Sequence, residues 1–323
     1  MYLVLRGIDA EPVASHLITD AAIDGCQRLN DGRGDVELVM WMAKDCGMNT
    51  IEAMLAAKRI PLGMQVFTGN SALIEILGLT GYDFVMIDCE HSYNNARQLE
   101  EQIITADAAG LFTFVRVSRH DDESDIHRAI EAGAGGVFLP LVRSLEDIQR
   151  AADAAYFPPK GTRGVCPSFR AAKYNWRDFD AYAARNNLEV MLVPMIERVE
   201  AVDNIEEICA HEDVKIIVFA PGDLAYALGE KSGLMRGPRI QEAYRKVLDA
   251  ARRHGVAVMG GPVLAPTPQA CRKAIDDGIT IFCLGLDTMA FRSWCENAVG
   301  ALEAGVDGTA FTRPPAPPSG FPS

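Results

Sequence analysis

The sequence lacks the features that would direct it to a membrane, to nucleic acid or to a metal–sulfur site. No apolar run approaches the roughly 20 residues that a bilayer-spanning helix needs, and the apolar start at residues 1–5 is too short for a signal peptide. Positive charge is scarce: the 323 residues carry a formal net charge of −13, which does not attract phosphate backbones or anionic lipids. The eight cysteines include no Cys-x-x-Cys pair. We therefore expect a cytoplasmic protein with free thiols and no nucleic-acid or membrane partner.

The chain does contain a regular alternation of strand-like and helix-like segments from residue 62 onward. Short apolar runs predict eight strands at residues 62–67, 83–88, 112–117, 136–141, 190–197, 215–221, 256–260 and 281–285. Amphipathic segments predict helices between them at residues 95–109, 123–131, 145–155, 201–210, 238–254 and 269–277. Several of these helices are followed by glycine, the residue that favours a left-handed helix end.

This pattern predicts an α/β fold, a modified (β/α)8 TIM barrel, because repeated βα units surround a parallel sheet and such a barrel takes about 250 residues. We place the barrel and a C-terminal helix at residues 49–305. Residues 1–48 form an N-terminal extension of unknown role. Residues 306–323 are rich in proline and predict a disordered tail.

Candidate catalytic groups follow the predicted strands. In a parallel barrel, the loops at the carboxyl ends of the strands form the active site. The apolar run 84–87 ends in the sequence Asp-Cys-Glu-His, which supplies Asp88 and His91. Other strands end at Arg116, at Glu197 and near Asp223. The sequence therefore predicts one site built from several strands.

Glu197 and Asp223 are candidates to hold a divalent cation. They follow adjacent strands at equivalent positions, and no Cys or His ligand stands nearby. Two carboxylates with open positions favour Mg²⁺ or Mn²⁺, with Co²⁺ or Zn²⁺ as alternatives. The structural alternatives are a helix-start carboxylate for Glu197 and an N-cap for a helix beginning at Leu224 for Asp223.

Arg116 and His91 complete the candidate chemistry. A guanidinium at the end of an apolar strand needs an anionic partner; it would bind an oxoacid, or form a structural ion pair with Asp88 or Glu197. His91 titrates near neutral pH and suits a general base, with a solvated loop histidine as the alternative. No predicted strand ends in lysine, so a Schiff-base mechanism is disfavoured relative to a metal-dependent one.

Four motifs together resemble the HpcH/HpaI aldolase family, the class II pyruvate aldolases that include 4-hydroxy-2-oxoheptanedioate and 2-dehydro-3-deoxyglucarate aldolases. The similarity spans about residues 50 to 300 and keeps the motifs in the family's order. The matching segments are residues 82–91 (YDFVMIDCEH), 156–165 (YFPPKGTRGV), 196–197 (IE) and 220–224 (APGDL).

The resemblance implies a role for each candidate residue. Glu197 and Asp223 would bind the metal, and Arg116 would contact the keto or enolate oxygen of pyruvate. His91 would act as base through a water on the metal. The residue that orients His91 in the family is usually Asp, and Glu131 aligns with it here.

The resemblance also implies the substrate contacts. Backbone amides of the turn at Gly222 and Asp223 would hold the substrate carboxylate. Three positions depart from the family's pattern: Gln65 is often Trp, Met195 is Gln in some relatives, and Cys89 is often Gly. These departures predict an unusual acceptor pocket, with neutral drift as the alternative.

The sequence therefore predicts a metal-dependent carbon–carbon lyase that reversibly cleaves a 4-hydroxy-2-oxo acid to pyruvate and an aldehyde through a pyruvate enolate. One alternative is an oxaloacetate decarboxylase or macrophomate-synthase-like enzyme that uses the same enolate. A CoA-ester lyase is disfavoured because no basic CoA-binding surface is evident, and a non-catalytic oxoacid-binding protein remains a further alternative. Apolar positions in residues 288–302 suit a homo-oligomer, a hexamer or trimer of dimers as in the family.

Overall fold

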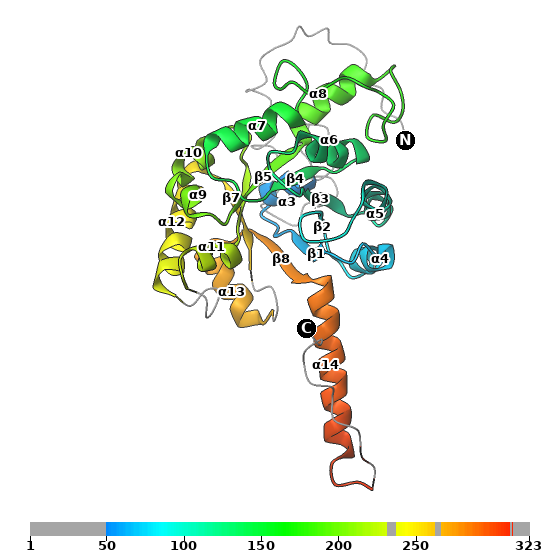
Figure 1. Ribbon diagram of the computed structural model, residues 1–323, viewed down its shortest axis with the longest axis vertical. Coiled ribbons are helices and arrows are strands. Elements are labelled where there is room, and N and C mark those ends of the chain that lie inside the picture. Colours follow the sequence, from blue (N-terminus) through cyan, green and yellow to red (C-terminus); the bar gives the residue numbers. More distant parts are fainter. Residues whose placement is uncertain (1–49, 231–236, 262–265, 311, 313–323) are drawn as a thin grey trace, which may run out of the picture.

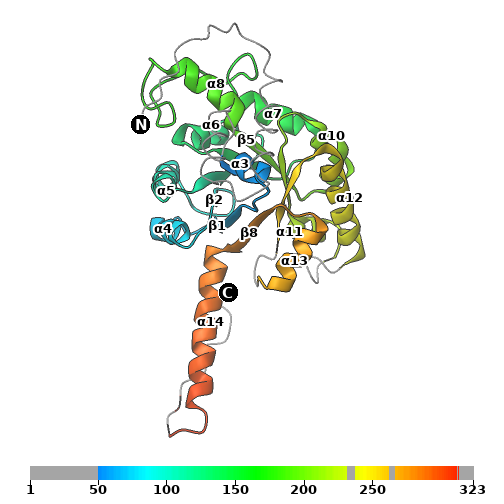
Figure 2. The ribbon, with the colours of Figure 1, turned by 180° about the vertical axis from the view of Figure 1, so that it is seen from behind.

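The computed structural model describes residues 50–230, 237–261, 266–310 and 312. In this part of the chain, eight parallel strands form a closed barrel in sequence order, surrounded by helices (Figures 1 and 2). The strands are β1 (Leu62–Val66), β2 (Phe84–Asp88), β3 (Phe112–Arg116), β4 (Gly136–Leu139), β5 (Met191–Ile196), β6 (Ile216–Phe219), β7 (Ala257–Gly260) and β8 (Ile281–Leu286). The predicted barrel is confirmed. The predicted extension and most of the predicted tail lie outside the described residues.

Helices lie at each of the predicted amphipathic segments, and the helices at residues 50–56, 71–79 and 179–189 were not predicted. The described helices are α3 (Thr50–Ala56), α4 (Ser71–Leu79), α5 (Ala96–Ala108), α6 (Glu123–Ala132), α7 (Leu145–Ala155), α8 (Phe179–Glu189), α9 (Val199–Asp203), α10 (Ile205–Ala210), α11 (Pro221–Ala227), α12 (Pro238–His254), α13 (Pro268–Asp277) and α14 (Asp287–Val306). The single helix predicted at 201–210 is two short helices separated at Asn204, whose side-chain amide donates to the carbonyl of Arg143. Glycines end α6, α12 and α13 in the left-handed conformation.

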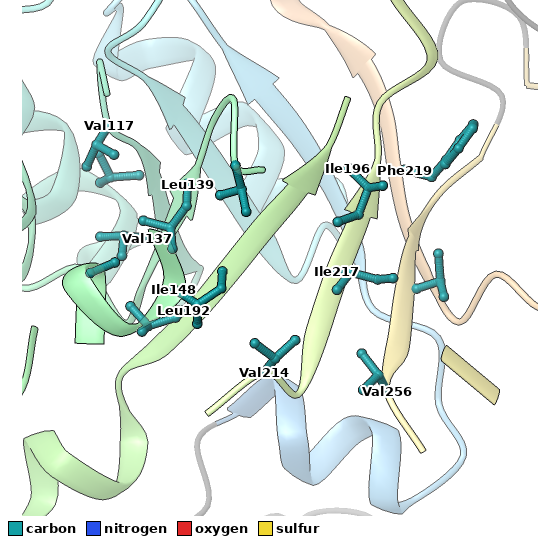
Figure 3. Close-up of a cluster of buried hydrophobic side chains, with 14 of the residues drawn as sticks. Val117, Val137, Leu139, Ile148, Leu192, Ile196, Val214, Ile217, Phe219 and Val256 are labelled. Carbon is teal, nitrogen blue, oxygen red and sulfur yellow. The ribbon is translucent and has the colours of Figure 1, made fainter. Parts of the chain in front are cut away.

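Successive residues of a strand face opposite sides of the barrel wall, as the pleat requires. In β4, Val137 and Leu139 pack outward against the helices, whereas Phe138 belongs to the cluster inside the barrel. Figure 3 shows part of the outer cluster, with side chains from β4 to β6 lying beside those of the helix layer. The inner cluster includes Phe84, Met86, Phe114, Phe138, Val193, Met195 and Val218. This alternation decides which strand-end residues face the barrel axis.

Helix α3 closes the amino end of the barrel. Ile51 is completely buried among the inner residues, which include the first residues of β2, β5, β6 and β8. Glu52 forms an ion pair of 2.5 Å with Lys215, the residue before β6. The barrel interior is therefore blocked at this end by apolar packing.

Helix α14 extends away from the barrel (Figures 1 and 2). Its first residue, Asp287, is buried and accepts hydrogen bonds from the backbone N–H groups of Phe67 and Thr68, both at 3.0 Å. Beyond it, Phe291 and Trp294 stack with ring centroids 6.4 Å apart and remain 66% and 67% exposed. No described helix is both long enough and apolar enough to cross a bilayer.

Candidate active site

Strand alternation brings the candidate residues to the carboxyl end of the barrel, facing inward. In β2 and β3, Asp88 and Arg116 come two residues after inner-cluster members and are aligned with each other across the pair. Glu197 follows β5 in the same way, two residues beyond Met195. We call the carboxyl end formed by these residues the barrel mouth.

Asp88 is completely buried, and its contacts hold the loop that follows it. One carboxylate oxygen accepts from Arg116 Nε at 2.6 Å and from the backbone N–H of Glu90 at 3.1 Å. The other accepts from the backbone N–H of His91 at 3.0 Å. Because its oxygens are occupied in this way, Asp88 positions Arg116 and the loop. Its expected catalytic role stays a prediction.

Arg116 is 7% exposed and lies between acidic partners. Besides Asp88, its Nη1 forms an ion pair of 3.0 Å with Glu90 Oε2, and its guanidinium lies 5.7 Å from the centroid of the Phe67 ring. The ion pair with Asp88 that the sequence left open is therefore present. A planar cation held at two points is fixed in direction, so it can face negative charge that develops on a bound molecule.

Glu90 is a member of the site that the sequence analysis did not single out. Its carboxylate lies 3.0 Å from Arg116 and 3.6 Å from His91 Nε2, and its side chain is 10% exposed. Burial raises the pKa of Glu90, and repulsion from Asp88 and Asp223 raises it further. Arg116 and His91 lower this pKa but do not outweigh the effect of burial. The signal was present in the stretch 88–91, where Glu90 is the second carboxylate.

His91 lies at the rim of the mouth. Its side chain is 61% exposed, and Glu90 is its carboxylate partner. This placement agrees with a base that is open to a substrate and also with a solvated loop histidine. Glu131 is not beside it: Glu131 lies in the last turn of α6, at the amino end of the barrel, and its Oε1 is 3.8 Å from Nη2 of Arg163. The expected pairing of Glu131 with His91 is not formed within the described chain.

Glu197 is a buried carboxylate with little compensation. It is 3% exposed, and Oε1 accepts from the backbone N–H of Leu141 at 2.6 Å. Burial raises the pKa of Glu197 to about 7, and repulsion from Glu90 and Asp223 adds to this effect, against the Leu141 N–H and Arg116. The carboxylate therefore accepts one backbone hydrogen bond, and its donor is Leu141. In the helix-start alternative the donor would belong to the first turn of α9, which begins two residues after Glu197.

Asp223 follows β6, the strand that pairs with β5, and lies in the first turn of α11. That helix begins at Pro221, with Ala220 as N-cap, so the alternative N-cap role of Asp223 is wrong. Asp223 is exposed and interacts electrostatically with both Glu197 and Glu90. A Cβ atom added at Gly222 would meet nothing within 4 Å, so the backbone of this turn is open to a ligand.

The donor set suits a hard divalent cation. Three carboxylates, on Glu90, Glu197 and Asp223, repel one another at the mouth, and a cation between them would favour their ionised forms. Among the residues that the structure describes, no group of three or more His, Cys, Asp or Glu is arranged to hold an ion. An ion held by the two carboxylates of Glu197 and Asp223 would keep positions open for water or substrate oxygens, as Mg²⁺ commonly does.

The remaining predicted residues line the interior below the mouth. Gln65 is half-buried in β1 and is paired with Met86 of the inner cluster, so it faces inward. Met195 is 4% exposed and lies in the inner cluster, one inward position below Glu197. Cys89 is not a nucleophile at neutral pH, because burial and the nearby Asp88 and Asp125 raise its pKa to about 12. None of the described strands ends in lysine.

A closed parallel barrel with a buried guanidinium and several carboxylates at its carboxyl end defines a barrel enzyme with a polar mouth that takes small oxygen-rich molecules. The chain belongs to the HpcH/HpaI aldolase/citrate lyase family, whose sequence profile matches residues 62–293. The predicted family is thereby confirmed, and with it the predicted class of carbon–carbon lyase.

Similar proteins agree with this assignment. A 5-keto-4-deoxy-D-glucarate aldolase of Citrobacter koseri is 30% identical over 262 residues, which cover 81% of this chain and 99% of that protein. The crystal structure of an HpcH/HpaI aldolase from Desulfitobacterium hafniense matches with a TM-score of 0.73 at 26% identity, over 81% of this chain and 99% of that one. Macrophomate synthase matches with a TM-score of 0.70 at 27% identity, over 79% and 88%.

Proposed function

We propose that the protein is a divalent-metal-dependent aldolase that cleaves a 4-hydroxy-2-oxo acid to pyruvate and an aldehyde. The observation that carries the proposal is the excess of negative charge at the mouth. Glu197 is buried with a pKa of about 7 beside Glu90 and Asp223, whereas Arg116 is already paired. A cation would compensate this charge.

Glu197 and Asp223 would hold the ion, with Mg²⁺ or Mn²⁺ preferred because the donors are carboxylate oxygens. When bound, the ion would act as a Lewis acid that polarises the 2-oxo group and stabilises the negative charge that develops on its oxygen. The open backbone at Gly222 and Asp223 would accept the substrate carboxylate.

The side chains of the chain itself move and balance charge. His91, at the exposed rim, takes the proton of the C4 hydroxyl, and the Glu90 carboxylate beside it stabilises the imidazolium that forms. As the C3–C4 bond breaks, the electron pair moves toward the 2-oxo oxygen, where the fixed Arg116 guanidinium faces it. His91 then returns its proton to C3 of the enolate, which gives pyruvate and restores the base. Asp88 accepts hydrogen bonds from Arg116 and from the backbone N–H of His91, and it thereby holds both in position.

The substrate class follows from the similar enzymes and the interior residues. The Citrobacter koseri relative is named for 5-keto-4-deoxy-D-glucarate, and we propose a sugar-acid-derived 2-oxo acid of this kind for this chain. Gln65 and Met195 face the barrel interior below the mouth, and they would contribute to the acceptor pocket that their departure from the family's pattern predicts.

A pyruvate-release assay with metal removal tests the proposal. EDTA should abolish pyruvate release from a 4-hydroxy-2-oxo acid, and Mn²⁺ or Mg²⁺ should restore it. Borohydride added with substrate should trap no adduct, because no lysine ends a described strand. A covalent adduct found by mass spectrometry, or full activity in EDTA, would refute the metal-dependent route.

A second candidate is decarboxylation of oxaloacetate, which produces the same enolate without an aldehyde. The similarity to macrophomate synthase, at 27% identity, favours keeping it. Incubation with oxaloacetate and Mg²⁺ separates the two reactions. Pyruvate formed faster from oxaloacetate than from every 4-hydroxy-2-oxo acid tested would make decarboxylation the main activity.

We also propose a homo-oligomer, a hexamer or trimer of dimers, assembled through α14. Its exposed Phe291 and Trp294 form an apolar surface away from the barrel, which suits burial against another copy. Sedimentation of the F291S/W294S variant should show a smaller assembly than wild type. An unchanged assembly would remove α14 from the interface.

A further inference from the structure

One peptide group at the mouth makes a hydrogen bond at each end. Its N–H, from Leu141, donates to Glu197 Oε1 at 2.6 Å. Its carbonyl, from Pro140, lies 2.8 Å from Nδ1 of His120. The peptide between residues 140 and 141 therefore lies between a buried histidine and the buried carboxylate of the site.

His120 belongs to the loop after β3 and is itself held from the other side. It is 7% exposed, and its Nε2 lies 3.3 Å from Asp147 Oδ1. The second oxygen of Asp147 accepts the backbone N–H groups of Arg143 and Ser144, at 2.8 and 3.2 Å. Because the Pro140 carbonyl can only accept, Nδ1 of His120 carries the proton in this bond.

The backbone at Leu141 requires such support. Its φ is +59°, in the left-handed region that residues other than glycine rarely adopt. In this conformation the Leu141 N–H donates to Glu197. A backbone that is unfavourable by itself persists when neighbouring contacts determine it from both sides.

We infer that His120 is a positioning residue for Glu197. Its Nδ1–H group fixes the carbonyl of Pro140, and the same peptide thereby presents the Leu141 N–H to the carboxylate. When Nε2 also carries a proton, it donates toward Asp147, which then orients the ring. The start of α7 is thereby connected to the site through three contacts. The metal-binding consequence rests on the proposed function, whereas the bond to Leu141 does not.

Matched variants test this role in the full chain. In H120N the side-chain amide places a donor near the position of Nδ1, whereas H120F fills the space without a donor. D147N weakens the interaction that orients His120, and it replaces H120F as the test variant if H120F fails to fold. H127F is the control, because His127 lies in α6 outside these contacts. Hydrogen exchange of the Leu141 amide, followed by NMR, reports the bond directly, and calorimetric titration with Mn²⁺ reports its effect on the ion.

H120F should speed exchange of the Leu141 amide by about tenfold and weaken Mn²⁺ binding by a similar factor, as expected for one lost hydrogen bond. H120N should restore both toward wild type, D147N should lie between, and H127F should change neither. Wild-type exchange of Leu141 in H120F, or an H120N variant as impaired as H120F, would overturn the inference. A wild-type protein that binds no Mn²⁺ would instead refute the proposed function, and the exchange measurement would still decide the role of His120.

Discussion

The two halves of the barrel mouth hold negative charge in different ways. On the β2–β3 side, the fully buried Asp88 meets a guanidinium at 2.6 Å and two backbone N–H groups. On the β5–β6 side, Glu197 is almost as buried but has one N–H partner and two repelling carboxylates, and its pKa rises to about 7. In the first half, the charge of Asp88 is balanced by the chain itself. In the second half, the negative charge would need a cation to compensate it. The comparison therefore distinguishes a structural side, around Asp88, from the side proposed to bind the ion, around Glu197.

Removal of Arg116 should give the largest effect, because it breaks the balanced half. R116M leaves Asp88 buried without its cation, which costs about 3–5 kcal/mol of unfolding free energy, and activity should fall by roughly 10³-fold as the group facing the developing charge is lost. Urea unfolding and pyruvate release measure the two. The double variant D88N/R116M should recover stability but not activity. Recovery of both would show that Arg116 is only structural.

Removal of the Glu197 charge should separate stability from function. E197Q keeps an acceptor for the Leu141 N–H but loses an anionic ligand, so Mn²⁺ affinity should fall by about 100-fold, as expected for a lost carboxylate ligand. Without metal at pH 8, its unfolding free energy should equal or exceed that of wild type, because no charge is buried. Calorimetric titration and urea unfolding check both. Tight Mn²⁺ binding by E197Q would contradict the assignment of the ligand.

The raised pKa of Glu197 predicts a pH dependence of cation binding. Between the ordinary glutamate pKa of 4.5 and a pH of about 7, the folded carboxyl keeps a proton that the unfolded one has lost. Stability of the metal-free protein should therefore fall, on account of this group, as pH rises through this range. Cation affinity should rise by up to about tenfold per pH unit and level off above pH 7, with release of a proton. Titrations in buffers of different ionisation enthalpy measure this proton, and E197Q should lose it.

The smallest effect is expected at Cys89, which lies between the balanced pair and His91. Its pKa of about 12 keeps the thiol protonated at neutral pH, so C89A should keep kcat and KM within about twofold of wild type. If iodoacetamide inactivated the wild-type protein but not C89A, the expectation of an unreactive thiol at Cys89 would be contradicted.

Strand periodicity explains why much of this site is predictable. A period of two places Asp88, Arg116 and Glu197 on the inner face once the strands are found, and a parallel barrel brings those ends together. The predicted barrel and family are confirmed. Asp223 is also found at the mouth, although its helix begins three residues earlier than the alternative interpretation required.

The parts that the sequence does not predict depend on loops and on helix ends. Glu90 faces Arg116 because Asp88 holds the backbone of its loop, and this contact has no periodic signal. Glu131 aligns with an orienting residue, but the end of α6 places it at the opposite end of the barrel from His91. The strand pattern places Asp88 on the inner face but does not predict its three hydrogen bonds, two of which come from the backbone of the following loop.

The apolar closure by α3 has a kinetic consequence. Ile51 packs into the amino end of the barrel. The substrate therefore enters, and both products leave, through the mouth at the carboxyl end. The fragment seated deeper must then wait for the outer one to depart. Product-inhibition patterns should accordingly be those of ordered release, with the aldehyde leaving first and pyruvate last.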